Sequence, residues 1–339
     1  MIHVIGLSDD TEAWDRFVEA APGASFCHLA GWREVMDDVL GHECLYLVAV
    51  EESDTTAGVL PLVSVKSRVF GRYLVSMPFL NAGGPLGAPQ ARAALAERAR
   101  EEAVRRGVRL LELRSRDGVA GFSLSRRKIS VVLDLPPEPD ALWGAFPSKL
   151  RSQIRRPQKE GLEARFGADQ RDAFYAVFAR NMRDLGMPVL PAALFARIAA
   201  VFPERVEFGA VWRGSEPVAA GCGFFWQYEF EITWASSLKE HSRSAPNMLL
   251  YWAFLERAIA RGARRFDFGR CTPGGGTHRF KLQWGGRDVP LPWAQWSPQQ
   301  GTATPSPERP LYRLAAACWS RLPLGVTNRV GPMLARQIP

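Results

Sequence analysis

Short apolar runs, some alternating with polar residues and some unbroken, recur along the first half of the chain. They predict strands, because half-buried and fully buried strands carry these patterns. An alanine-rich segment that stops at Gly107 predicts a helix between the third and fourth strands. The expected elements are strands at residues 45–51, 58–65 and 73–77, a helix at 91–106 and a strand at 108–114.

The second half repeats this order. Its patterns predict a hairpin from residues 206–212 and 217–225, a strand at 228–236, a helix at 247–261 that stops at Gly262, and a strand at 263–269. Strands joined by one crossover helix in each half indicate an α/β fold in which helices cover mixed sheets. The two halves therefore look like copies of one unit.

Short stretches of similar sequence support an internal repeat. Arg106-Gly107 parallels Arg261-Gly262, and in each half an acidic residue, Glu112 or Asp267, lies five residues beyond the glycine. The same elements in the same order are the signature of internal duplication.

Prolines divide the chain. Pro136, Pro137 and Pro139 interrupt any regular ladder, so we expect an N-terminal domain at residues 1–135 and a C-terminal domain at 136–298. Prolines in residues 299–310 predict a linker to a C-terminal tail, and the third segment is 299–339.

Composition narrows the class of protein. A chain of 339 residues exceeds the usual size of one core, which agrees with two domains. The net charge of +8 and the pI of about 9.5 favour an anionic partner such as a phosphate, a nucleic acid or a membrane surface. Charge alone does not choose among these, and a basic protein without a specific anionic ligand is the alternative.

Cysteines and apolar segments predict the compartment. Five cysteines, an odd number without paired metal-ligand spacing, indicate reduced thiols, no disulfides and no structural metal. The first ten residues lack a basic start followed by an apolar run, and no stretch of about 18 apolar residues occurs. We expect a cytoplasmic protein.

A basic segment follows the predicted domain boundary. Arg151 and Arg155 are one helical turn apart, so both can face a phosphate. Pro157 is expected to end or kink the helix and to leave Lys159 on a turn. The cations of this segment are Lys149, Arg151, Arg155, Arg156 and Lys159. The alternative is a solvated basic face beside a linker.

A second candidate lies before the crossover helix of the second half. Ser244 suits the N-cap position and Pro246 the first turn, and the free N–H groups of such a terminus attract anions. Arg243 and Asn247 flank this junction as candidate ligand contacts. Helix capping without a ligand is the alternative.

The third candidate is the stretch from Phe266 to Gly285. Three consecutive glycines, residues 274–276, predict a loop that lets the backbone approach a ligand closely. Lys281 follows between aromatic residues, where partial desolvation suits an ammonium that stabilises an oxyanion or a phosphate. A surface lysine whose stem covers apolar neighbours is the alternative.

A hydrolase triad is not indicated, because no serine has the Gly-x-Ser-x-Gly setting. Asp267 and His278 are candidate general bases. Asp267 lies between two phenylalanines, so it is also expected to brace the glycine loop by accepting backbone N–H bonds.

Several of these motifs together resemble one family. Phe26-Cys-His-Leu-Ala-Gly-Trp-Arg-Glu-Val, Pro78-Phe-Leu-Asn-Ala-Gly-Gly, Lys149-Leu-Arg-Ser-Gln-Ile-Arg, Asn247-Met-Leu-Leu and the stretch from Phe-Asp-Phe-Gly to Phe-Lys-x-x-Trp-Gly are similar to the FemAB family. The likeness runs from about residue 10 to residue 296 and is strongest to the branch found with exosortase and PEP-CTERM exopolysaccharide systems.

The resemblance implies two tandem GNAT-like (acetyltransferase-like) domains and an acyltransferase reaction. An amine of a cell-envelope or exopolysaccharide precursor attacks an activated acyl ester, and the donor is aminoacyl-tRNA or an acyl-coenzyme A. It implies Lys281 as the residue that stabilises charge during transfer, and Asp267 is the second candidate catalytic residue. The implied substrate-binding residues are Lys149, Arg151, Arg155, Arg156, Trp32, Asn81, Arg243, Asn247, Arg270, Phe280 and Trp284.

Two other functions stay open. One is acetyl transfer from acetyl-coenzyme A to an amine, and the other is a non-catalytic module that binds an envelope polymer or a nucleic acid, although we expect no DNA partner.

The C-terminal tail suggests a further hypothesis. From residue 309 onward it holds five arginines, no acidic residue and interspersed apolar residues, a pattern suited to an anionic membrane surface, with docking onto the body as the alternative.

Overall fold

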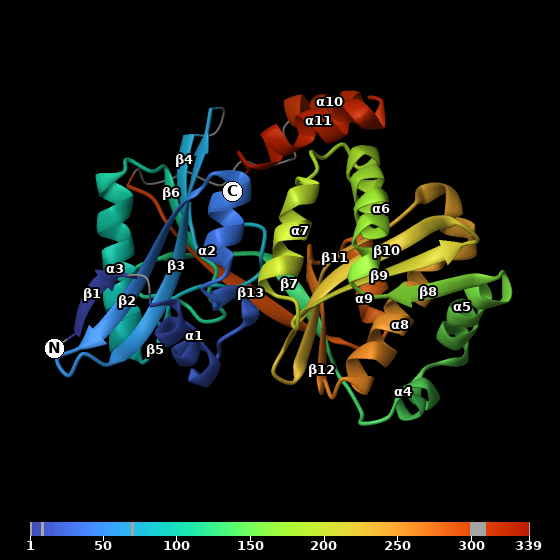
Figure 1. Cartoon of the computed structure of the whole chain (residues 1–339), viewed down its shortest axis with the longest axis horizontal. Coiled ribbons are helices and arrows are strands. Elements are labelled where there is room, and N and C mark those ends of the chain that lie inside the picture. Colours follow the sequence, from blue (N-terminus) through green and yellow to red (C-terminus); the bar gives the residue numbers. More distant parts are fainter. Residues whose placement is uncertain (1, 8–9, 69–70, 299–309, 339) are drawn as a thin grey trace. The chain divides into compact units, whose positions relative to one another are not determined.

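The computed structural model describes residues 2–7, 10–68, 71–298 and 310–338 of the chain, and these divide into two compact units (Figure 1). Unit 1 comprises residues 1–128, 290–308 and 333–339, and unit 2 comprises residues 129–289 and 309–332.

Unit 1 is built on a mixed sheet in the order β1-β2-β3-β4-β6-β13, with β5 beside β3. The strand β4 runs parallel to β6, whereas the other neighbours are antiparallel. Its strands are β1 (Ile2–Gly6), β2 (Glu43–Glu51), β3 (Thr56–Ser67), β4 (Gly71–Val75), β5 (Leu86–Gly87), β6 (Leu110–Leu113) and β13 (Arg287–Trp296).

Helices cover both faces of this sheet. The alanines of α3 (Pro89–Arg105) pack on Leu47 and Leu62, while Trp14 of α1 (Thr11–Ala20) packs on Tyr46 with ring centroids 4.9 Å apart. Leu47 and Tyr46 are neighbours on β2 and so point to opposite faces. The remaining turns are η1 (Phe26–His28) and α2 (Trp32–Glu34), which continues as the π-helix η2 (Val35–Val39).

In unit 2 the strands are hydrogen-bonded in the order β7-β12-β11-β10-β9-β8. The pair β11 and β12 is parallel, and the other pairs are antiparallel. The strands are β7 (Ser123–Asp134), β8 (Leu162–Phe166), β9 (Val206–Arg213), β10 (Glu216–Trp226), β11 (Glu229–Ser237) and β12 (Arg265–Cys271).

One face of this sheet carries α4 (Pro139–Ala145), α5 (Ser148–Lys159) and α8 (Pro246–Ala260), which share a core with the apolar residues of β11 and β12. On the other face Phe195 meets Trp234 edge to face, which places α6 (Arg171–Asp184) and α7 (Ala192–Val201) there. Further elements are η3 (Ala168–Gln170), η4 (Lys239–Ser244), α9 (Gly276–Leu282), α10 (Pro310–Trp319) and α11 (Leu324–Ala335).

The predicted repeat is present. In each unit two antiparallel hairpin partners lead into a strand, a crossover helix and a parallel strand. Both crossover helices, α3 and α8, begin with proline, which suits the first turn because its missing N–H has no helical partner. Both are followed by a glycine with positive φ, Gly107 at 59° and Gly262 at 80°, the left-handed conformation that ends helices.

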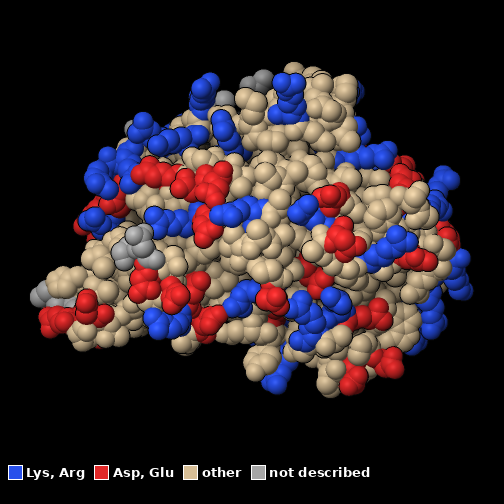
Figure 2. Space-filling view, in the orientation of Figure 1, with Lys and Arg blue, Asp and Glu red and all other residues tan. Residues whose placement is uncertain are grey.

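The chain passes from one unit to the other inside β7, β13 and α11, so each compact unit takes segments from both sides of the predicted boundaries at residues 135 and 298. The linker predicted at 299–310 lies outside the described residues except for Pro310, the first residue of α10. No described helix combines the length and the apolar character that a membrane span requires. On the face drawn in Figure 2 the two signs of charge are interspersed.

Candidate active site

The candidate site begins where the parallel ladder of unit 2 ends. The ladder joins Glu229–Glu231 of β11 to Arg265–Asp267 of β12, and both strands run on beyond it. Its last pair consists of Glu231 and Asp267, both buried. Gly269 follows with a φ of +72°, and a Cβ atom at this position would lie 2.6 Å from the carbonyl oxygen of Ile232. Only glycine fits this close approach of β12 to β11 without strain.

Lys281 places its ammonium beyond the end of this ladder. The side chain is 3% exposed, and Nζ donates to the carbonyl oxygens of Gly269 at 2.6 Å and Arg270 at 3.1 Å. Burial lowers the pKa of Lys281 to about 8, because desolvation disfavours the charged form, while Cys271, Asp267 and Glu231 oppose that shift. The desolvation expected for Lys281 is confirmed.

A short helix, α9, carries Lys281. The third glycine of the run, Gly276, is the first residue of α9, so the ordered segment starts earlier than the sequence indicated. Two neighbouring glycines keep the tight turn before it, where Gly274 has a φ of 75°. The helix fixes the direction of the lysine stem toward β12.

His278 and Asp267 brace this turn and the strand end. The Nδ1 atom of His278 accepts the N–H of Gly274 at 2.9 Å, which leaves the ring proton on Nε2 to be donated to Asp288 at 2.8 Å. Asp267 Oδ1 accepts the N–H of Gly269 at 2.7 Å and a short hydrogen bond from Ser130. Asp267 thus accepts a backbone N–H as expected, but from Gly269 at the strand end rather than from the glycine loop at 274–276.

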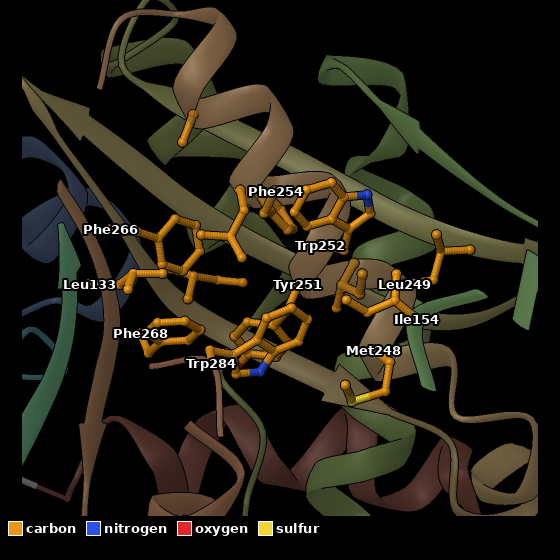
Figure 3. Packing of buried hydrophobic residues seen from close by; sticks show 14 of the residues in the cluster. Leu133, Ile154, Met248, Leu249, Tyr251, Trp252, Phe254, Phe266, Phe268 and Trp284 are labelled. Atoms are coloured by element: carbon orange, nitrogen blue, oxygen red, sulfur yellow. The ribbon is translucent and has the colours of Figure 1, made fainter. Parts of the chain in front are cut away.

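Aromatic side chains that flank Lys281 in the sequence pack into the hydrophobic core of unit 2 (Figure 3). Phe280 packs edge to face on Tyr251 with centroids 5.0 Å apart, and Trp284 lies 6.3 Å from Phe268. Trp284 is fully buried in the core of unit 2, whereas Phe280 is half-buried at its rim. Of these two predicted contacts, Phe280 is the one with surface left to meet a ligand.

The basic segment forms α5, which has an apolar inner face of Leu150, Ile154 and Pro157. Pro157 does not end the helix, and Lys159 is its last residue rather than part of a turn. A proline costs one backbone hydrogen bond and causes a clash, and near a helix end the packing of its buried ring can offset this.

The cations of α5 lie outside that inner face. Arg155 lies over the ring of Trp143 at 5.0 Å, and Arg156 pairs with Glu160 at 3.3 Å. Arg151 is half-buried and Lys149 is exposed. These cations and Lys281 are all in unit 2, but they rest on different elements.

The junction before α8 differs from expectation at one residue. Ala245, with a φ of 51°, occupies the N-cap, so the predicted role of Ser244 is wrong, while Pro246 does occupy the first turn. Arg243 is exposed on η4, Asn247 is half-buried on α8, and Arg270 is exposed on β12.

Trp32 and Asn81 belong to unit 1. Trp32 is fully buried and donates from Nε1 to the carbonyl oxygen of Phe26 at 2.8 Å. The carbonyl oxygen of the buried Asn81 accepts from Trp293 at 3.2 Å. Both residues thus take part in packing that holds unit 1 together.

Sequence reasoning missed Glu231 and Cys271, which act on the pKa of Lys281, and Ser130, which donates to Asp267. Glu231 had a signal, since it stands between Phe230 and Ile232 in a strand pattern that buries it. Ser130 had none, because β7 reaches β12 only through a pairing between segments more than 100 residues apart in the chain.

Residues 148–282 match the family described as acetyltransferase (GNAT) domain. No curated protein sequence matches the chain.

Three solved structures extend the likeness over nearly the whole chain. FemX has a TM-score of 0.67 at 14% identity and covers 93% of this chain and 100% of its own. The C-terminal domain of a putative lysylphosphatidylglycerol synthetase from Agrobacterium fabrum has a TM-score of 0.59 at 13% identity, covering 91% and 96%. A tandem GNAT protein from the clavulanic acid biosynthesis pathway has a TM-score of 0.57 at 13% identity, covering 89% and 100%. The predicted fold, two tandem GNAT-like units with mixed sheets, is confirmed.

Proposed function

We propose that this protein is an acyltransferase whose reaction takes place in unit 2, at the end of the β11–β12 ladder. The observation that carries the proposal is the buried ammonium of Lys281. Among the described residues, the carbonyl oxygens of Gly269 and Arg270 accept hydrogen bonds from Nζ of Lys281. An ammonium has three N–H groups, so two of the three have these partners. We infer that the third N–H donates to negative charge that develops on a substrate.

The reaction joins an amine to an acyl group. The amine nitrogen attacks the carbonyl carbon of the donor, a C–N bond forms, and the C–O bond of an ester or the C–S bond of a thioester breaks. Negative charge gathers on the carbonyl oxygen in the transition state, where Lys281 stabilises it. A preorganised donor in a dry site is worth much more than the same donor in water. The amine loses its proton and the leaving group gains one.

Asp267 supports this step through other groups. Its carboxylate holds the N–H of Gly269 and so fixes one of the carbonyl oxygens that position Nζ. Its negative charge also favours the charged form of Lys281. The proposal therefore gives Asp267 an electrostatic and positioning role in catalysis.

The donor and acceptor follow from the family resemblance. A FemAB-like enzyme takes aminoacyl-tRNA as donor, and its acceptor is an amine of a cell-envelope precursor. The cations Lys149, Arg151, Arg155 and Arg156 of α5 are proposed to bind phosphates of the precursor or of the tRNA. The exosortase and PEP-CTERM branch, with an exopolysaccharide precursor as acceptor, is the narrower form of this proposal.

A second donor has specific support, because the family matched by residues 148–282 is an acetyltransferase domain. In that case the donor is acetyl-coenzyme A or another acyl-coenzyme A. Thermal-shift measurements with acetyl-coenzyme A, charged tRNA and nucleotide sugars distinguish the donors, since a ligand of the folded state raises Tm by mass action. A shift with uncharged nucleic acid alone, falling steeply with salt, would instead favour the non-catalytic binding module.

Substitution of Lys281 tests the chemistry. We expect Lys281→Met to lower the transfer rate by roughly a hundredfold or more, because the donor to the developing charge is lost. Methionine fills the same volume without charge, so Tm should stay near that of the wild type. Leu282→Ala, one residue away and partly exposed, is the matched control with near wild-type rate. Full activity of a folded Lys281→Met protein would rule out the assignment.

A further inference from the structure

The C-terminal helix α11 has a buried inner face. On α11 the residues Thr327, Gly331 and Ala335 recur at helical spacing and are buried. A Cβ atom on Gly331 would lie 3.0 Å from the backbone nitrogen of Val189, so this inner face rests directly on unit 2.

A different face of α11 points to solvent and is also apolar. Val326, Val330, Met333 and Leu334 recur at positions i, i+4, i+7 and i+8 and are 44%, 38%, 57% and 41% exposed. This spacing forms one stripe along a helix. We call these four residues the outer stripe of α11.

Neighbouring segments of unit 2 extend the apolar surface. Leu314 of α10 is 63% exposed, and Leu185 and Met187, in the segment on which α10 rests, are 60% and 50% exposed. The contact between this segment and α10 is tight, because a Cβ atom on Gly186 would lie 2.6 Å from the Cβ atom of Ala316. Single exposed apolar residues need no explanation, but a group of them marks an interaction surface.

The positive charge of α10 and α11 indicates an anionic partner. Residues 309–339 hold five arginines and no aspartate or glutamate. Arg313, Arg321 and Arg329 are exposed, and Figure 2 shows blue and tan surface over α10 and α11. Two copies of the chain meeting through this face would bring like charges together, whereas an anionic surface would attract them.

We propose that α10 and the outer stripe of α11 dock on an anionic lipid surface. The helices are 10 and 12 residues long, about half of what a bilayer crossing needs, so they lie in the interface with arginines reaching the headgroups. The proposal is independent of the transfer chemistry, which a membrane-bound or a free enzyme can perform.

Co-sedimentation of the full-length protein with lipid vesicles tests this proposal. We expect binding to vesicles of phosphatidylglycerol mixed with phosphatidylcholine and at least tenfold weaker binding to phosphatidylcholine alone, with binding falling as salt rises. The double substitution Val330→Glu with Met333→Glu should weaken binding at least tenfold, because it puts anions into the stripe. Val104→Glu is the matched control, since Val104 is 62% exposed on α3 of unit 1.

Three outcomes would overturn the proposal. The first is a wild-type protein that stays in the supernatant with anionic vesicles at low salt, and the second is equal binding by the double variant. The third is concentration-dependent dimerisation in sedimentation velocity that the double variant abolishes while vesicle binding is unaffected, because a second copy would then cover the stripe. Transfer activity on a free substrate, measured in parallel, should be unchanged in the double variant.

Discussion

At the scale of residues, the Nζ atom of Lys281 lies among two carbonyl oxygens and near the acidic groups of Asp267 and Glu231, and burial lowers its pKa to about 8. Hydrogen bonds and nearby anions favour the ammonium, while desolvation opposes it. Because these effects nearly balance, Lys281 stays mostly protonated near neutral pH, as the proposed reaction needs.

This balance predicts a pH dependence of stability. The ordinary pKa of a lysine is 10.5, so between pH 8 and 10.5 the unfolded chain binds more protons at this residue than the folded protein does. The contribution of Lys281 to the free energy of unfolding must then rise with pH across that window, by up to roughly 3 kcal/mol. Urea unfolding of wild-type and Lys281→Met proteins at pH 7.5 and pH 10.5 measures this, because other titrations cancel in the difference. A difference that does not change with pH would show that the folded-state pKa of Lys281 is ordinary.

At the scale of elements, Gly269 controls how β12 approaches β11 and presents the carbonyl oxygen that holds Lys281. We expect Gly269→Ala to lower the free energy of unfolding by about 2 kcal/mol, because it combines positive φ with a Cβ atom 2.6 Å from the carbonyl oxygen of Ile232. Transfer activity should fall about tenfold in the protein that still folds, since Nζ loses its position. Gly276→Ala is the control, because nothing lies within 4 Å of a Cβ atom there. A Gly269→Ala protein as stable as that control would contradict this role for the backbone.

Some of the helices and strands could be predicted from the sequence, and others could not. The strands, the crossover helices and the repeat are visible in apolar spacing and in the Arg-Gly helix ends, because these are local signals. The strands β1, β5, β7, β8 and β13 were not predicted. The first half of β7 is mostly exposed, and β13 contains Pro290 and Pro292, which argue against a strand. Pairing with β6, at Ala294–Trp296, comes after those prolines and depends on a partner about 180 residues away in the chain.

Comparison of the equivalent strand ends supports placing the chemistry in unit 2. In unit 1 the parallel ladder of β4 and β6 also ends at an acidic residue, Glu112. There Arg114 pairs with Glu112 at 3.0 Å, donates to the carbonyl oxygen of Leu80 at 2.8 Å, and lies over the ring of Trp293 at 4.4 Å. The guanidinium and the indole pack together at this strand end, where unit 2 has the ammonium of Lys281.

At the scale of the whole molecule, unit 1 is built mainly from the first half of the chain but also contains segments from near its C-terminus. Its folding therefore depends on those late segments. The strand β13 supplies unit 1 with the partner of β6, and its Gln295 donates to the buried carboxylate of Glu112 at 2.7 Å. Trp293 of the same strand covers Arg114. A fragment of residues 1–135 would therefore expose the edge of β6 and leave a buried ion pair partly unsatisfied.

We accordingly expect the fragment 1–135 to aggregate or to unfold without a cooperative transition. Residues 1–135 joined through a glycine-serine linker to residues 286–298 should regain a cooperative transition, because the ladder, the Gln295 hydrogen bond and the Trp293 contact return together. The same fusion with Trp293→Ala and Gln295→Ala separates the two contributions, since it keeps the backbone ladder and loses both side-chain contacts. Circular dichroism during thermal unfolding distinguishes the three proteins. A cooperative, soluble fragment 1–135 would mean that the N-terminal half folds without the strand that the C-terminal part of the chain contributes.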